Sequence, residues 1–147
     1  MRKRTQSREC ALKILYQKDV TNFGLDVIAE RFWQDAHEEY SPQIREFTTR
    51  LVYGVSEHCQ EIDQKIMAYA TNWQLKRMAF IDRNILRLGV FELFYAEDIP
   101  PKVTINEAVE LAKKFGDLES SKFVNGILDK MHKTEIVALQ DKQQDAD

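Results

Sequence analysis

One stretch of the chain, Asp82–Ala96, reads DRNILRLGVFELFYA and decides the fold. When these residues are placed on a helix, apolar side chains cover most of its circumference. A helix that is apolar on nearly every side is buried, with other elements packed around it. Gly89 in its middle lowers the helix propensity by about 1 kcal/mol relative to alanine. We therefore predict a buried central helix that a second helix crosses closely at Gly89.

The segments on either side of this central helix also carry apolar residues at helical spacing. Ser7 and Thr104 are the expected N-caps of two of these helices, Thr104 in a capping box with Glu107. Ser41-Pro42 starts another, and Asn72 caps a short piece. The predicted helices cover about 7–19, 25–38, 44–69 with a bend or break near 54–59, 82–96, 104–115 and 119–133.

The predicted fold is therefore all-α: two fused three-helix bundles with six to seven helices and no strand. We expect one compact domain over residues 1–133, with sub-bundles at about 1–71 and 72–133, because no Gly/Pro-rich linker divides it. Only 5 Gly and 3 Pro are present, which argues against a sandwich or barrel with many tight turns. Residues 134–147 are acidic and lack periodicity, so we expect a disordered tail there.

The composition excludes several classes of protein. Cys10 and Cys59 form no CxxC pair, so a disulfide framework and a zinc site are both poorly supported, and we expect no cofactor. No apolar run approaches the roughly 18 residues of a membrane span, and the N-terminus lacks the apolar core of a signal peptide. A cytoplasmic protein without membrane contact is expected.

Catalysis has little support in the sequence. There is no GxxxxGK[ST], GxGxxG or HExxH motif. His37, His58 and His132 are scattered, and each is expected to be a surface or boundary side chain. We therefore predict that the protein is not an enzyme.

Nucleic-acid binding is better supported, by the predicted helix over 119–133. When each residue advances 100°, Phe123 falls at the margin of the buried face, and beyond it come Lys122, Lys130 and Lys133. An aromatic ring beside ammonium groups is typical of a single-strand site, where bases stack and phosphates are neutralised. A marginal Phe can equally be covered by a neighbouring loop, and Glu119 and Asp129 dilute the positive charge.

Two further features bear on partners. Four basic residues precede any acid at the N-terminus, and they would support a site at Phe123 only if they fold close to it: Arg2, Lys3, Arg4 and Arg8. Tyr16 and Asp82 could each belong to a protein interface. Alternatively, Tyr16 belongs to the apolar stripe of its helix, and Asp82 is favoured at a helix N-terminus by the dipole.

Four segments together resemble the bacterial transcription antitermination factor NusB family. The match runs in order through about residues 4–132, and its most specific part is the third segment. The segments are Arg8-Glu9-Cys10-Ala11-Leu12 with Leu15-Tyr16, the central Asp82–Leu93, Ile99-Pro100 with Val103–Gly116, and Ser121–Asp129.

The resemblance implies two three-helix bundles and a function in transcription antitermination. It implies binding to the boxA segment of nascent RNA together with NusE, which is also a ribosomal protein. The heterodimer would help to assemble an antitermination complex on RNA polymerase, chiefly during ribosomal RNA transcription. By position, Tyr16 and Asp82 would face NusE. With Lys130 from the lysine face, the RNA-binding set is Arg2, Lys3, Arg4, Arg8, Glu119, Lys122, Phe123 and Lys130.

Two alternatives remain at this point. The same helical module occurs at the N-terminus of some ribosomal RNA cytosine methyltransferases, so the chain could be such an RNA-binding domain detached from its enzyme. A helical scaffold that binds no RNA at any salt concentration is the third possibility.

Overall fold

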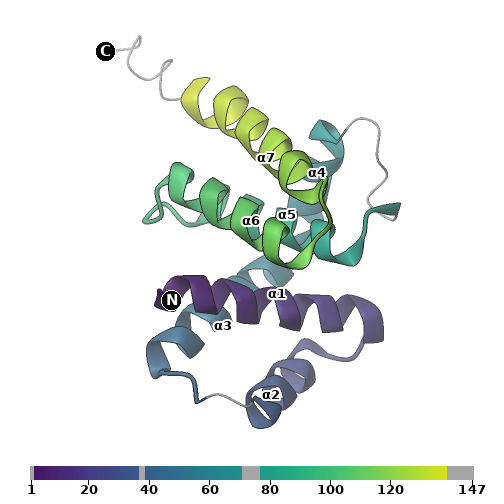
Figure 1. The fold of residues 1–147 in the computed structure, drawn as a ribbon, viewed down its shortest axis with the longest axis vertical. Helices are drawn as coiled ribbons and strands as arrows, with labels where there is room; N and C mark the ends of the chain where they lie inside the picture. The colour runs from purple at the N-terminus through teal and green to yellow at the C-terminus, as the bar shows by residue number, and fades with distance from the viewer. Residues whose placement is uncertain (1, 37–38, 71–76, 139–147) are drawn as a thin grey trace.

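The computed structural model describes residues 2–36, 39–70 and 77–138, and over these residues it contains helices and no strand (Figure 1). The prediction of an all-α fold is confirmed. Two residues named in the sequence analysis lie outside the described residues: His37, and Asn72 with its predicted cap. The elements are α1 Lys3–Thr21, α2 Leu25–Asp35, α3 Pro42–Glu57, α4 Cys59–Tyr69, α5 Phe80–Tyr95, α6 Pro101–Phe115, α7 Ser120–Met131 and a final π-helical stretch, His132–Val137.

Helix α5 lies at the centre of the molecule, as its sequence predicts. It packs against α6, α7 and α4 on one side and against α1 and α3 on the other. Gly89 lies where α7 crosses it. A Cβ atom at this position would lie 2.7 Å from Leu128 Cδ1, which is too close for two carbon atoms. The low helix propensity of Gly89 is therefore the cost of a close crossing between α5 and α7.

The remaining helices form two groups around α5. α1 packs with α2 and α3, whereas α4, α6 and α7 pack with α5. The division into sub-bundles at about 1–71 and 72–133 stays a prediction. The break expected near 54–59 lies at His58, between α3 and α4. The apolar stripe continues through this break, because Val55 before it and Ile62 after it are both buried in the same core.

A buried ion pair joins the two groups of helices. Arg8 on α1 donates from Nε and Nη2 to the two carboxylate oxygens of Glu92 on α5, at 2.9 and 2.7 Å. The two side chains are only 3% and 2% exposed. The Thr104 hydroxyl also donates to Glu92, and the Glu107 carboxylate lies 3.8 Å from Arg8 Nη1. The prediction that Arg8 contacts RNA is therefore wrong, because its guanidinium is enclosed by protein and cannot reach a phosphate.

The expected N-caps at Ser7 and Thr104 are also wrong. α1 begins at Lys3 and α6 at Pro101, so both residues lie inside their helices. Their hydroxyls bind groups of other helices instead: Ser7 donates to the Ile44 carbonyl at 2.9 Å, and Thr104 donates to Glu92 at 3.1 Å. Short polar side chains serve as caps or as buried donors, and sequence alone does not distinguish the two uses.

The end of the described chain differs from the expected disordered tail. The helical stretch continues through Val137, and its Glu135 accepts hydrogen bonds from Lys65 and Tyr69 of α4, both at 2.8 Å. These contacts hold residues 134–138 against α4. Residues 139–147 lie outside the described residues.

Candidate functional site

Phe123 lies at a cavity of about 580 Å³ where α5 and α7 begin. Its ring packs against the hydrophobic core on one side and is partly exposed. The side chain is therefore at the margin of the core and not deeply buried. The cavity is lined by Met78, Ala79, Asp82, Asp117, Glu119, Ser120, Lys122 and Phe123, so four of the predicted site residues meet here: Asp82, Glu119, Lys122 and Phe123.

This cavity carries more negative charge than the sequence predicts. Three carboxylates, those of Asp82, Asp117 and Glu119, face one ammonium group, that of Lys122. Asp117 is held by its own turn: its Oδ1 accepts from the backbone N–H groups of Glu119 and Ser120, at 2.9 and 3.0 Å. The Glu119 N–H and the groups of Ser120 lower the pKa of Asp117, so it stays ionised. The cavity thus repels phosphate and suits a ring with N–H donors at its edge, such as a nucleobase.

The other lysines of α7 contribute unequally. Lys122 and Lys130 are exposed, at the start and near the end of the helix. Lys133, just after α7, forms an ion pair of 2.9 Å with Asp129. The lysine face that the sequence predicts is therefore present, but part of its charge is neutralised within the chain.

The basic N-terminal residues are not brought to Phe123. Arg2, Lys3 and Arg4 are exposed, but α1 runs alongside α6 in the same direction. Arg4 lies 3.7 Å from Asp98, before α6 begins, whereas the Lys13 Nζ lies 5.9 Å from the Phe115 ring, where α6 ends. Thr5 donates to Glu107 in the middle of α6 at 2.8 Å, and Arg2 lines a cavity with Glu107 and Glu110. The basic arm therefore lies beside α6 and away from the start of α7 (Figure 1).

The seam between α1 and α6 does not provide a cationic path between the arm and Phe123. A shallow cavity of about 360 Å³ there carries three carboxylates and two cationic side chains. Lys114 is already bound by Glu9 at 2.7 Å. A nucleic acid that reaches both the arm and Phe123 must cross a surface that offers little attraction to its phosphates.

An exposed apolar cluster lies next to the Phe123 cavity. Tyr16 and Val20, one turn apart on α1, are 38% and 51% exposed, and Phe80 at the start of α5 is 40% exposed. The Tyr16 and Phe80 rings meet edge to face with their centres 6.2 Å apart. We call Tyr16, Val20 and Phe80 the α1–α5 patch. Ala79, which precedes Phe80, and Asp82, which follows it by two residues, line the cavity of Phe123, so the patch and the cavity meet at the start of α5.

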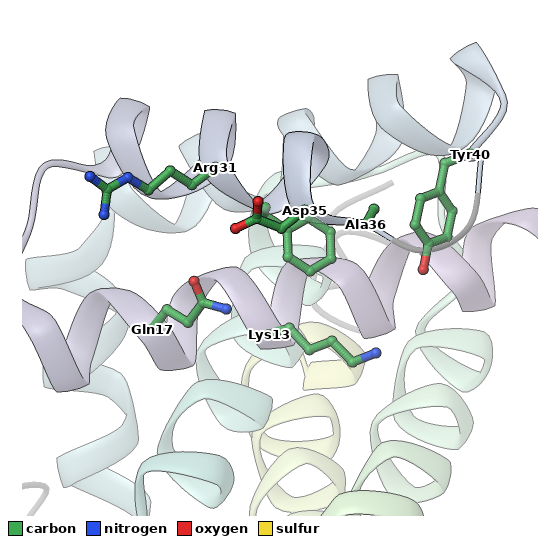
Figure 2. Close-up of a pocket in the computed structure, with 7 residues that line it drawn as sticks. Lys13, Gln17, Arg31, Asp35, Ala36 and Tyr40 are labelled. Carbon is green, nitrogen blue, oxygen red and sulfur yellow. The ribbon is translucent and has the colours of Figure 1, made fainter.

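Another cavity, of about 530 Å³, lies between α1 and α2 (Figure 2). Its cations are Lys13 and Arg31. Figure 2 shows that their side chains extend toward opposite ends of the cavity, and Asp35 lies between the two helices. Cationic groups that diverge in this way cannot bind one anion together, so this cavity is a weaker candidate than that of Phe123.

Within the described ranges, no helix is long and apolar enough to cross a membrane, and no group of His, Cys, Asp or Glu could hold a metal ion. His58 and His132 are partly buried, and His58 stacks on Tyr95 with the ring centres 4.0 Å apart.

A profile of the NusB family matches residues 5–133. The chain belongs to the NusB family. The transcription antitermination protein NusB of Anaeromyxobacter dehalogenans is 49% identical over 129 residues, which cover 88% of this chain and 89% of that protein. The similarity is thus to nearly whole antitermination proteins, and it does not favour the methyltransferase alternative.

Solved structures of the NusB family share the fold. T. maritima NusB has a TM-score of 0.81 at 39% identity, covering 89% of this chain and 91% of its own. A crystal structure of the antitermination factors NusB and NusE in complex with double-stranded RNA contains a chain with a TM-score of 0.81 at 29% identity, covering 90% of this chain and 98% of that one.

Sequence analysis missed Val20 and Phe80 in this NusB-family protein. A signal for Val20 was present, since it follows Tyr16 at the i, i+4 spacing of one helix face. Phe80 carries no such signal, because its neighbour is Tyr16, 64 positions earlier in the chain. Only the packing of α5 against α1 brings the two rings together.

Proposed function

We propose that this NusB-family protein binds boxA-type single-stranded RNA as a heterodimer with ribosomal protein NusE. In this role it helps to assemble an antitermination complex on RNA polymerase during ribosomal RNA transcription, in the cytoplasm and without catalysis. The observation that carries the proposal is the partly exposed Phe123 ring in a cavity adjoining the exposed α1–α5 patch. The complex of a related NusB with NusE and double-stranded RNA supports the choice of NusE and of RNA as partners, and the single-stranded form is our proposal.

In the proposed RNA contact, one base stacks on Phe123, and Lys122 and Lys130 meet the flanking phosphates. The N–H donors of that base would face the carboxylate of Glu119. Base stacking on an aromatic side chain requires an unpaired or flipped base, which favours a single strand over a duplex. Arg2, Lys3 and Arg4 would bind phosphates of the same strand beside α6.

In the proposed partner contact, NusE covers the α1–α5 patch. Exposed aromatic rings in contact with each other are typical of the centre of a protein interface. Asp82 would lie at the boundary between the partner and the RNA, because the patch and the Phe123 cavity meet at the start of α5. RNA and NusE could then bind side by side and contact each other.

A titration of labelled boxA RNA with and without NusE, at several salt concentrations, tests this proposal. When three to four of the five cations Arg2, Lys3, Arg4, Lys122 and Lys130 each neutralise one phosphate, the slope of log K against log salt is roughly −2 to −3 for a single strand. NusE should increase the affinity for RNA, and a duplex of the same sequence should bind less tightly. The proposal fails if NusE leaves the RNA affinity unchanged, or if binding is absent at low salt.

Reversing the charge of Asp82 is expected to separate the two contacts. Asp82→Lys should weaken the NusE complex, because it changes the charge beside the α1–α5 patch. It should leave RNA binding without NusE equal or tighter, because it removes one carboxylate from the Phe123 cavity. Calorimetric titration of each partner measures both effects. Glu97→Lys, with the same charge change just beyond the other end of α5, is the control. Equal weakening by both variants would contradict a local role of Asp82.

A further inference from the structure

The carboxylate of Asp19, on α1 between Tyr16 and Val20, connects the two helices that carry the α1–α5 patch. Its Oδ2 accepts hydrogen bonds from three side chains in one turn of α5. Arg83 donates from Nη2 at 2.9 Å and from Nε at 3.1 Å, Asn84 donates at 2.8 Å and Arg87 at 3.0 Å. One oxygen of α1 thus fixes the first two turns of α5.

Arg83 links this carboxylate to the aromatic rings of the patch. Its guanidinium lies over the Phe80 ring, with its carbon 4.7 Å from the ring centre. Phe80 in turn meets Tyr16, and Tyr16 lies one turn before Asp19 on α1. These contacts therefore connect Asp19 to Tyr16 through α5: Asp19 binds Arg83, Arg83 lies over Phe80, and Phe80 meets Tyr16. Tyr16 and Asp19 both belong to α1.

A second carboxylate of similar burial shares one hydrogen-bond partner with Asp19, the guanidinium of Arg87. Asp63 on α4 binds Arg87 with both oxygens, at 2.8 and 2.9 Å. Its side chain is 20% exposed, and that of Asp19 is 19% exposed. Asp63 joins α4 to α5, whereas Asp19 joins α1 to α5 and also bonds to Arg83. The chain thus offers a matched pair of carboxylates, of which one supports the patch.

The charges around Asp19 keep it ionised. Burial raises the pKa of Asp19, but the hydrogen bond from Asn84 and the charges of Arg87 and Arg83 outweigh burial, so the net shift is downward. The carboxylate is therefore charged at neutral pH, and its bonds to the guanidinium groups are of the strong, charge-assisted kind.

We propose that Asp19 is a positioning residue for partner binding, which holds Arg83 against Phe80 and so fixes the two rings of the α1–α5 patch in one geometry. This inference rests on the proposed function, in which NusE covers the patch. A surface whose rings are already ordered loses less conformational entropy when a partner binds, and its affinity is correspondingly higher.

The test compares Asp19→Asn with Asp63→Asn in the full chain. Asp19→Asn should weaken NusE binding about tenfold, whereas Asp63→Asn should leave it within about twofold, although both variants lose a charge-assisted bond. Urea unfolding measures the stability of both, and RNA binding without NusE should be unchanged in both. A purely structural role of Asp19 would lower stability and NusE affinity alike in the two variants.

A double-mutant cycle with Phe80→Ala adds a second readout. If Asp19 acts through Phe80, Asp19→Asn should have little further effect on NusE affinity once the ring is absent. Additive losses would overturn the inference, as would wild-type affinity in Asp19→Asn. Failure of the wild-type protein to bind NusE would instead overturn the proposed function, and the partner role of Asp19 with it.

Discussion

Replacing Glu92 by alanine is expected to lower the free energy of unfolding by about 3–5 kcal/mol, because it leaves the Arg8 guanidinium buried without its main partner. Both side chains are almost fully enclosed, and the pair has bidentate geometry. Removing one member of a buried pair costs far more than the net value of the pair, since the desolvation of the remaining charge is no longer compensated. Urea unfolding followed by circular dichroism measures the loss.

Two controls distinguish the stability loss caused by a buried, unpaired charge from the loss that follows when an exposed ion pair is removed. Arg50 and Asp98 form another two-point pair, but their side chains are 39% and 51% exposed. Asp98→Ala should therefore cost only about 0–1 kcal/mol. Replacing both buried partners, Arg8→Met with Glu92→Leu, should recover most of the stability lost in Glu92→Ala. A small loss in Glu92→Ala would show that water reaches Arg8 and would reopen its assignment to the RNA site.

The sequence predicted the general architecture well because the decisive signals are local. The apolar circumference of 82–96 and the glycine within it follow from helix geometry alone, and both the burial of α5 and the close crossing at Gly89 are observed. The end of α6 at Phe115 is likewise marked by the Gly116 that follows it. Such signals need no knowledge of what packs on the helix.

Composition alone could not distinguish the role of Arg8 from that of its basic neighbours. The helical spacing of the apolar residues, however, indicates that Arg8 is buried. Arg8 lies in phase with Leu12 and Leu15, four and seven residues later, and so points into the core. Glu92 is an acid within a helix that is otherwise apolar on most sides. A cation in one apolar stripe and an anion in another indicate a buried pair, whereas Arg2 lies off this stripe.

The candidate site was predictable in part. The projection of the predicted helix over 119–133, at 100° per residue, placed Phe123 at the edge of the buried face and Lys122 beyond it. Both residues line the cavity. The acidic lining contributed by Asp82 could not be predicted, because that residue comes from another helix. The distance of the basic arm from Phe123 also depends on the parallel arrangement of α1 and α6, a tertiary feature without a local signal.

Replacing Phe123 by alanine is expected to weaken RNA binding by about 1–3 kcal/mol, or roughly five- to 150-fold in Kd, if a base stacks on the ring. Stacking involves no phosphate, so the slope of log K against log salt should stay the same. Lys122→Ala, at the neighbouring position, should instead reduce the magnitude of that slope by about 0.7, the value of one phosphate contact on a single strand. Fluorescence titrations of boxA RNA at several salt concentrations measure both quantities.

Two aromatic variants define what the Phe123 result means. Phe123→Trp keeps a flat ring and should retain most of the affinity. Phe115→Ala removes an equally large, partly buried ring at the end of α6, beside Lys13 and Lys114, and should lower stability without affecting RNA affinity. Wild-type affinity in Phe123→Ala would remove the ring from the site. Binding would then depend on the lysines of α7 and on the exposed arm of α1.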